Sequence, residues 1–272
     1  MVGQARQVAM NRPVALVTGA ARGIGAATVA HLVADGWSVV AVDICADVPT
    51  IEYSLASPDE LAAVGTAGGG HVMTMNADVR SQVELEDAAE AAVEHFGRLD
   101  AAVAAAGVFK ARTPLWEVSD TEWNTITDID LTGVFQTARA AISRILVSAE
   151  PRRGRFVAVS SSAGTIGLSK MAPYVAAKHG VIGLVKALAV DLAGTGITSN
   201  AVAPGSTRTA ILEASAAAFD TDINEFAAHQ RPLGRLVEPS EVAAAICWLC
   251  SADAAAVTGT VVPVDGGMTS TL

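Results

Sequence analysis

Cysteine and basic residues are scarce in this sequence of 272 residues, and each scarcity argues against a class of protein. Three cysteines, Cys45, Cys247 and Cys250, are too few and too scattered for a disulfide framework, which favours a reducing cytoplasm. Lys and Arg number 18 against 28 Asp and Glu, and the resulting net charge of −10 repels phosphate backbones and anionic lipids. We therefore expect neither a nucleic-acid partner nor a membrane partner.

Long apolar runs are also missing, although 51% of the residues are hydrophobic. No run approaches the roughly 18 apolar residues that a membrane span needs, and residues 1–12 lack the apolar core of a signal peptide. Because only 17% of the residues are charged, the composition also excludes a disordered chain. We expect a cytoplasmic protein with a flexible leader at 1–12 and a single domain over 13–272.

Short apolar runs alternate with helical patterns along the whole chain. Helices are indicated at 23–35, 119–150, 174–193 and 241–250, with further starts where Ser57, Ser81 and Ser119 each precede a Glu by three residues, as in a capping box. Residues 207–239 are weakly periodic, and we interpret them as a mobile lid. Strands are predicted at 13–18, 37–43, 71–76, 99–104, 155–160, 198–203 and 260–264. This alternation predicts an α/β fold: a single-domain, Rossmann-like, doubly wound parallel sheet of about seven strands with helices on both faces.

The first strand leads into a glycine-rich turn, Thr18 to Gly25, that opens a helix. Glycines there permit a tight turn and let a pyrophosphate approach the backbone at a helix N-terminus, although such a turn can also serve packing alone. Asp43 ends the next strand, where a carboxylate can accept from an adenosine ribose and repel a 2′-phosphate. The pair predicts NAD rather than NADP, with Arg22 as a counterweight because its guanidinium could reach a phosphate.

Tyr174 stands four residues before Lys178, so the two share a helix face. An ammonium near a phenol favours the phenolate and lowers the Tyr pKa toward a range useful for proton transfer. Ser161 ends an apolar strand upstream and could meet the phenol over the same substrate oxygen. The alternative is a solvated helix pair without chemistry.

These residues together resemble the short-chain dehydrogenase/reductase family, and the resemblance runs from Pro13 to Gly267. It implies that Tyr174 is the acid/base, that Ser161 orients the carbonyl or alcohol, and that Lys178 tunes Tyr174. It also implies a homotetramer. The cofactor-binding residues that spacing and resemblance together indicate are Gly19, Arg22, Gly23, Ile24, Gly25, Asp43, Asp78, Val79, Ala105, Gly107, Tyr174, Lys178, Pro204, Gly205, Thr207 and Thr209.

The sequence departs from the family pattern at two places. Ala104 to Gly107 replaces the usual Asn-Asn-Ala-Gly and so loses a side-chain amide that props the strands. Asp130 replaces the family's fourth catalytic residue, an Asn that holds a water of the proton relay. A buried carboxylate near Lys178 would stabilise the ammonium and change the optimum pH.

A narrower resemblance lies in residues 44–61, which lengthen a connection that is short in most of the family. This insertion is similar to that of the mycofactocin-coupled branch, whose members keep NAD bound and pass electrons to a peptide-derived redox carrier. The alternative is a loop elaboration without that role. Cys247 and Cys250 have the spacing of a redox motif but lie in an alanine-rich helix, so we expect buried packing. The five His residues are dispersed, and we expect no metal site.

The sequence therefore predicts an NAD-dependent oxidoreductase that interconverts a secondary alcohol and its ketone. The composition of 211–226 favours a hydrophobic substrate such as a terpenoid, steroid or lipid alcohol. A 3-oxoacyl carrier-protein reductase is the alternative enzyme, although NADPH would conflict with Asp43. A sensor that binds NAD without turnover is the alternative outside the enzymes.

Overall fold

The computed structural model describes residues 12–148, 153–230 and 232–270. The predicted flexible leader at 1–12 lies outside the described residues apart from Arg12. None of the helices within these three stretches is long and apolar enough to cross a lipid bilayer.

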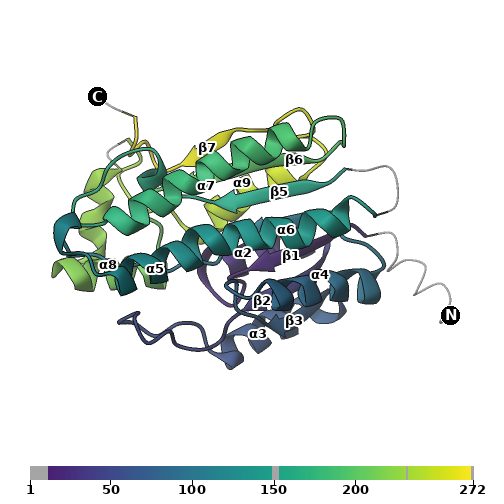
Figure 1. The fold of residues 1–272 in the computed structure, drawn as a ribbon, viewed down its shortest axis with the longest axis horizontal. Coiled ribbons are helices and arrows are strands. Elements are labelled where there is room, and N and C mark those ends of the chain that lie inside the picture. Colours follow the sequence, from purple (N-terminus) through teal and green to yellow (C-terminus); the bar gives the residue numbers. More distant parts are fainter. Residues whose placement is uncertain (1–11, 149–152, 231, 271–272) are drawn as a thin grey trace.

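A parallel sheet runs through the middle of the molecule (Figure 1). Within the described residues it has seven strands in the order β3-β2-β1-β4-β5-β6-β7, which confirms the predicted doubly wound fold. Because the order reverses between β1 and β4, the loops after these two strands open a crevice at the carboxyl edge of the sheet. The strands are β1 (Val14–Thr18), β2 (Ser38–Asp43), β3 (Val72–Asn76), β4 (Ala101–Ala104), β5 (Arg155–Val159), β6 (Thr198–Pro204) and β7 (Val261–Val264).

Helices cover both faces of the sheet, so the central strands are buried on both sides and are almost entirely apolar. One face is covered by α4, α6 and α7, which lie in front of the strands in Figure 1, and the other by α2, α3 and α9. Alternate residues of a strand point to opposite faces of the sheet. Val14 and Leu16 pack into the first core cluster, under α4, α6 and α7, whereas Ala15 and Val17 pack into the second, under α2, α3 and α9. The helices are α2 (Gly23–Ala34), α3 (Pro58–Gly68), α4 (Gln82–Phe96), α5 (Asp120–Thr127), α6 (Gly133–Ile145), α7 (Ala172–Asp191), α8 (Ala210–Phe219) and α9 (Pro239–Cys250).

The helix starts read from the sequence are confirmed as N-caps. The side chains of Ser57, Ser81 and Ser119 each accept a hydrogen bond from the backbone N–H three residues later. Only at Ser57, among these three, is the capping box reciprocal, because Glu60 also accepts from the Ser57 N–H. Glu84 instead accepts from the N–H of Asp78 and so holds the end of the preceding loop.

The predicted long helix over 119–150 is helical from Asp120 to Ile145, but it is not one regular α-helix. A π-helical turn at Asp128–Thr132 separates α5 from α6, and residues 149–150 lie outside the described residues. π-turns of this kind are frequent at functional sites. This one carries Asp130, whose side chain is fully buried between α7 and the loop after β4.

Residues 207–239 contain helices that their weak periodicity did not predict. The segment holds α8 and a 3-10 helix at Ile223–His229. Its ends meet, because Thr207 and Val237 form a parallel β-bridge. Figure 1 shows α8 at the same end of the molecule as α5 and the long connection between β2 and α3. The excursion therefore leaves the sheet and returns to it at one place.

Candidate active site

A cavity of about 720 Å³ opens at the carboxyl edge of the sheet. Its floor is made by the residues that follow β1 to β6, and Met268, beyond β7, also lines it, as expected for the crevice of a doubly wound sheet. Every residue that the sequence singled out for cofactor binding or catalysis lines this cavity, including Asp130, Ser161, Tyr174 and Lys178. The fold thus brings together side chains that are up to 190 positions apart, from Gly19 to Thr209.

The glycine turn after β1 has no room for side chains. A Cβ on Gly19 would lie 2.6 Å from the Cα atom of Ala106, and one on Gly25 would collide with the carbonyl of Gly19. Gly19 and Gly23 both have positive φ, +66° and +58°, a conformation that glycine adopts without strain. The turn is therefore a bare backbone surface at the start of α2.

Asp43 holds its carboxylate beside that turn. Its Oδ2 accepts from the N–H of Ala21 at 3.0 Å and its Oδ1 from the N–H of Cys45 at 3.4 Å. Arg22 reaches in the opposite direction, because its Nη2 donates to the carbonyl of Ser54 at 2.8 Å. The Arg22 guanidinium, which in the sequence was the one feature that argued against NAD, is thus bound to the insertion.

The turn after β4 keeps its shape without the asparagine that it lacks. The N–H groups of Ala105 and Ala106 both point at the Oγ1 of Thr18, at 3.3 and 3.4 Å. The hydroxyl at the end of β1 thus supplies a link between the two neighbouring strand ends. Asp78 and Val79 complete this side of the cavity, and the carboxylate of Asp78 is held by Arg80, which lowers the Asp78 pKa although burial opposes it.

Asp130 and Lys178 form a buried ion pair beneath the cavity floor. Lys178 Nζ lies 3.2 Å from Asp130 Oδ2 and donates to the carbonyl of Val159 at 3.3 Å. The Oδ1 of Asp130 accepts from the N–H of Val108 at 2.8 Å. Burial acts to lower the pKa of Lys178, but the charges of Asp130 and Tyr174 and the hydrogen bond to Asp130 together outweigh it and raise that pKa above its usual value. The lysine is therefore held as an ammonium.

Tyr174 lies one turn before Lys178 on α7, and its ring is 5.5 Å from the Lys178 ammonium. Burial raises the pKa of the Tyr174 phenol; the Lys178 charge and the Ser161 hydroxyl act to lower it, and the Asp130 charge raises it further. The predicted net lowering of this pKa is wrong, because desolvation exceeds the attraction of one ammonium that is already paired. Ser161 Oγ accepts from the N–H of Ala163 and so begins the short turn after β5.

The loop after β6 carries Pro204, Gly205, Thr207 and Thr209 into the cavity wall. Thr209 caps α8, its Oγ1 accepting from the N–H of Leu212 at 3.4 Å. Between them, these four residues form the rim from which the excursion leaves the sheet.

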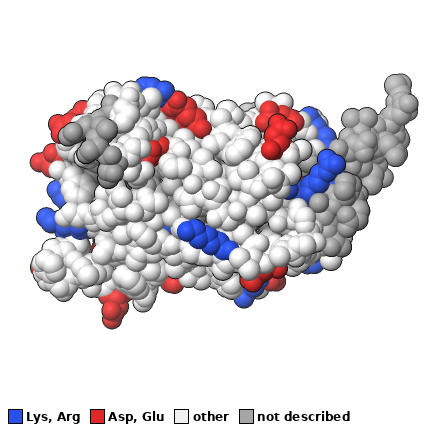
Figure 2. Space-filling model, turned by 90° about the horizontal axis from the view of Figure 1, so that it is seen from above, with Lys and Arg blue, Asp and Glu red and all other residues white. Residues whose placement is uncertain are grey.

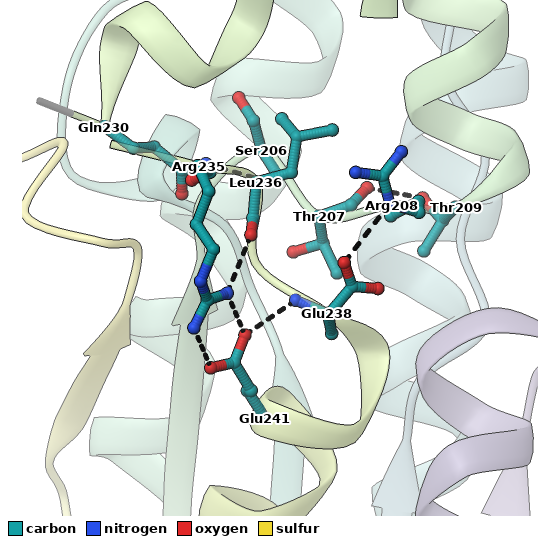
Figure 3. A network of polar contacts seen from close by, with 9 residues as sticks. All are labelled: Ser206, Thr207, Arg208, Thr209, Gln230, Arg235, Leu236, Glu238 and Glu241. Carbon is teal, nitrogen blue, oxygen red and sulfur yellow. Dashed lines mark hydrogen bonds and ion pairs between the residues drawn. The ribbon is translucent and has the colours of Figure 1, made fainter. Parts of the chain in front are cut away.

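Figure 3 shows how the base of the excursion is fastened. Gln230 is fully buried and donates from Nε2 to the carbonyls of Ser206 and Arg235, at 3.0 and 3.1 Å. Arg235 in turn binds both carboxylate oxygens of Glu241 at the start of α9. The excursion is thus anchored from both of its ends.

Two aromatic residues that line the cavity, Tyr53 and Phe109, were not predicted from the sequence. Tyr53, from the insertion, lines the cavity, and its hydroxyl accepts from the N–H of Phe109 at 3.0 Å. The ring of Phe109 meets the Tyr174 ring edge-on, with 5.7 Å between centroids. A signal was available, because Tyr53 and Tyr174 are the two tyrosines of the chain. Cys247 and Cys250 are buried and unpaired on α9, where burial raises the Cys247 pKa to about 12, so the expected packing role is confirmed.

Residues 19–269 match a family model described as enoyl-(acyl carrier protein) reductase. The chain is 36% identical to the (−)-trans-carveol dehydrogenase of Rhodococcus erythropolis, covering 94% of this chain and 97% of that protein. It is also 36% identical to the cyclohexanol dehydrogenase of an Acinetobacter species, covering 96% of each. Among solved structures, the carveol dehydrogenase from Mycobacterium avium in complex with NAD is similar with a TM-score of 0.89 and 32% identity, covering 95% of this chain and 98% of that one.

Proposed function

Because the chain belongs to the short-chain dehydrogenase/reductase family, we propose that it is an NAD-dependent oxidoreductase that interconverts a secondary alcohol and its ketone. One observation carries the proposal: Ser161, Tyr174 and Lys178 line the same cavity as the glycine turn and Asp43. A proton-transfer group and a dinucleotide cradle within one cavity are what alcohol oxidation by NAD requires.

The cradle fits a dinucleotide. Its bare glycine backbone would accommodate a pyrophosphate at the start of α2, and the Asp43 carboxylate beside it would hold the adenosine ribose and repel a 2′-phosphate. We assign adenine contacts to Asp78 and Val79, and the nicotinamide side to the rim from Pro204 to Thr209. When bound, NAD would supply the acceptor for the hydride that leaves the carbinol carbon.

The protein side chains move and hold the proton. Tyr174 takes the hydroxyl proton of the alcohol, and Ser161 holds the substrate oxygen beside it. Lys178 stabilises the phenolate that Tyr174 must become, since its charge is the strongest influence that lowers the Tyr174 pKa. Asp130 keeps Lys178 charged and fixes its position from below.

The substrate part of the cavity has a mostly apolar wall. The lining side chains of α8 are apolar or small, among them Ile211, Leu212 and Phe219, and Leu168 and Met171 before α7 are apolar as well. Thr221, Glu225 and His229, which follow α8, add polar groups to this wall. Relatives of the chain are named for carveol and cyclohexanol. We therefore propose a small hydrophobic alcohol as the substrate class.

The insertion supports the finer proposal that NAD stays bound and that electrons leave through an external, mycofactocin-type carrier. Val48, Tyr53 and Leu55 turn inward to line the cavity, and Arg22 of the glycine turn binds the carbonyl of Ser54. A nucleotide in the cradle would lie beneath a connection that is bonded to the cradle itself. Slow release follows from that geometry, because the connection must open before NAD can leave.

We further propose assembly as a homotetramer, through the long helices and the edge strand β7. Trp123 and Phe135 are 39% and 43% exposed on α5 and α6, and Val190 is 74% exposed on α7. Figure 2, which looks onto the molecule from above, shows a surface with few charged side chains across its middle. Exposed apolar side chains and an unpaired strand edge are what a subunit interface would cover.

The proposal is tested first by the nucleotide in the purified protein. We expect stoichiometric NAD(H) on denaturation and little exchange of labelled NAD into the intact protein. Empty protein that binds NAD reversibly would remove the carrier proposal and leave an ordinary dehydrogenase. A preference for NADP would contradict the role of Asp43 and favour the 3-oxoacyl carrier-protein reductase.

Tyr174→Phe separates the enzyme from a sensor. Removing one hydroxyl from the cavity should abolish the reduction of bound NAD by cyclohexanol while nucleotide retention is unchanged, because the phenol oxygen carries the proton and the ring remains. The reaction is followed by the absorbance of NADH. Tyr53→Phe, which removes the other phenol of the cavity, should slow the reaction without abolishing it. If the wild-type protein retained NAD but gave no NADH with any secondary alcohol, the non-catalytic alternative would stand.

A further inference from the structure

The insertion is fastened to the short segment that follows β4. Tyr53 accepts a hydrogen bond from the N–H of Phe109 at 3.0 Å. Lys110 reaches the insertion twice, with its Nζ 3.1 Å from Glu52 Oε1 and 3.4 Å from the carbonyl of Thr50. In Figure 1 the insertion extends from the end of β2 toward α5, away from the strand that it follows. Phe109 and Lys110 therefore make three polar contacts with the insertion.

The same segment also contacts the proposed catalytic cluster. The N–H of Val108 donates to Asp130, and the ring of Phe109 packs edge-on against Tyr174 at an interplanar angle of 78°. Phe109 is 5% exposed, so its ring has little freedom to move away. Of two successive backbone N–H groups, that of Val108 thus binds the catalytic cluster and that of Phe109 binds the insertion.

Tyr53 suits this position because its hydroxyl is fixed and stays neutral. Its ring packs against the first core cluster, and burial raises the pKa of the phenol well above its usual value. A buried N–H group that loses its acceptor is costly, so loss of the Tyr53 contact would weaken the hold on Phe109 even though Val108 remains bound to Asp130.

From these contacts we propose that Tyr53 is a positioning residue, which holds Phe109 against Tyr174 and so couples closure of the insertion over the nucleotide to the placement of the catalytic phenol. The inference rests on the proposed function. It adds to it a residue of the insertion that acts on the rate of the chemical step as well as on cofactor retention.

Three variants separate the two effects. Tyr53→Phe removes the acceptor and should both speed the exchange of labelled NAD and slow the single-turnover formation of bound NADH from cyclohexanol, each by about tenfold. Phe109→Leu removes the ring edge but keeps the N–H bound to Tyr53, so it should slow NADH formation alone. Thr125→Val removes the contact of α5 with Thr50 of the insertion, 2.9 Å between hydroxyl oxygens, and should speed exchange alone.

The pattern across the three variants decides the inference. If Tyr53→Phe matches Thr125→Val, with faster exchange and an unchanged rate of NADH formation, Tyr53 is only a fastener and the coupling is refuted. If Phe109→Leu reacts at the wild-type rate, the ring contact has no role and the proposal fails even when Tyr53→Phe does not fold. A wild-type protein that neither holds NAD nor reduces it with any secondary alcohol refutes the proposed function instead, and the two failures are thereby distinct.

Discussion

At the scale of single residues, the departure from the family pattern at Asp130 matters most. An asparagine there would be neutral, whereas the carboxylate is fully buried and has Lys178 as its charged partner. Burial raises the Asp130 pKa, and the Lys178 ammonium and the Val108 N–H oppose that rise. Removing one partner of a buried pair leaves the other charge uncompensated, so the two residues act as a unit.

We predict that Asp130→Asn moves alcohol oxidation to lower pH. The Asp130 charge raises the pKa of both Tyr174 and Lys178, so its removal lets the first proton leave this pair at lower pH. Oxidation needs the phenolate, and its rate rises with pH through the apparent pKa of the pair. The rate of NADH formation, measured from about pH 6 to about pH 11, should therefore reach its half-maximum at lower pH in the variant.

Asp128→Asn is the matched control for that prediction. It removes the same charge from the same π-helical turn, but Asp128 is exposed and its field is screened by water. Its pH profile should coincide with the wild-type profile. An unshifted profile for Asp130→Asn would mean that the carboxylate is already neutral in the working enzyme.

At the scale of elements, the lid formed by 207–239 is held by one buried amide and by several surface ion pairs. Gln230 satisfies two carbonyls inside the base of the excursion, whereas Arg208 and Glu238 pair at its surface with side chains about half exposed (Figure 3). Exposed pairs contribute little because water competes for both charges. The anchoring should therefore depend on the amide.

Gln230→Leu should lower the free energy of unfolding by about 1–3 kcal/mol, because it removes the two hydrogen bonds that Gln230 donates to the carbonyls of Ser206 and Arg235, of which only the Ser206 carbonyl keeps a second donor, the N–H of Val237. Arg208→Met, the comparison variant, should cost less than about 1 kcal/mol. Urea denaturation of both proteins measures the difference. Equal losses would show that the surface pairs carry the base of the lid.

The insertion between β2 and α3 shows what an element-level pattern leaves open. Its length was visible in the sequence, but its direction depends on contacts such as Tyr53 with Phe109, which are 56 positions apart. The π-helical turn was invisible for a related reason. No proline or glycine interrupts Asp128 to Thr132, and the turn instead places Asp130 between Val108 and Lys178.

At the scale of the whole molecule, the strand order is what makes a site. Because the sheet winds outward from β1 and then from β4, residues after each of its seven described strands line one cavity. The net charge of −10 repels anionic molecules, whereas it exerts no net force on a neutral one. This is consistent with a neutral alcohol as the substrate.

Local patterns of the chain were enough to predict the sheet, most of the helix starts and the residues around the cavity, because alternation, capping and glycine turns depend on residues near one another in the sequence. The net direction of the Tyr174 pKa, the π-helical turn at Asp130 and the contact between Tyr53 and Phe109 could not be predicted in this way. They depend on burial and on neighbours supplied by distant segments. Desolvation and packing of this kind exist only once folding has brought the strand ends together.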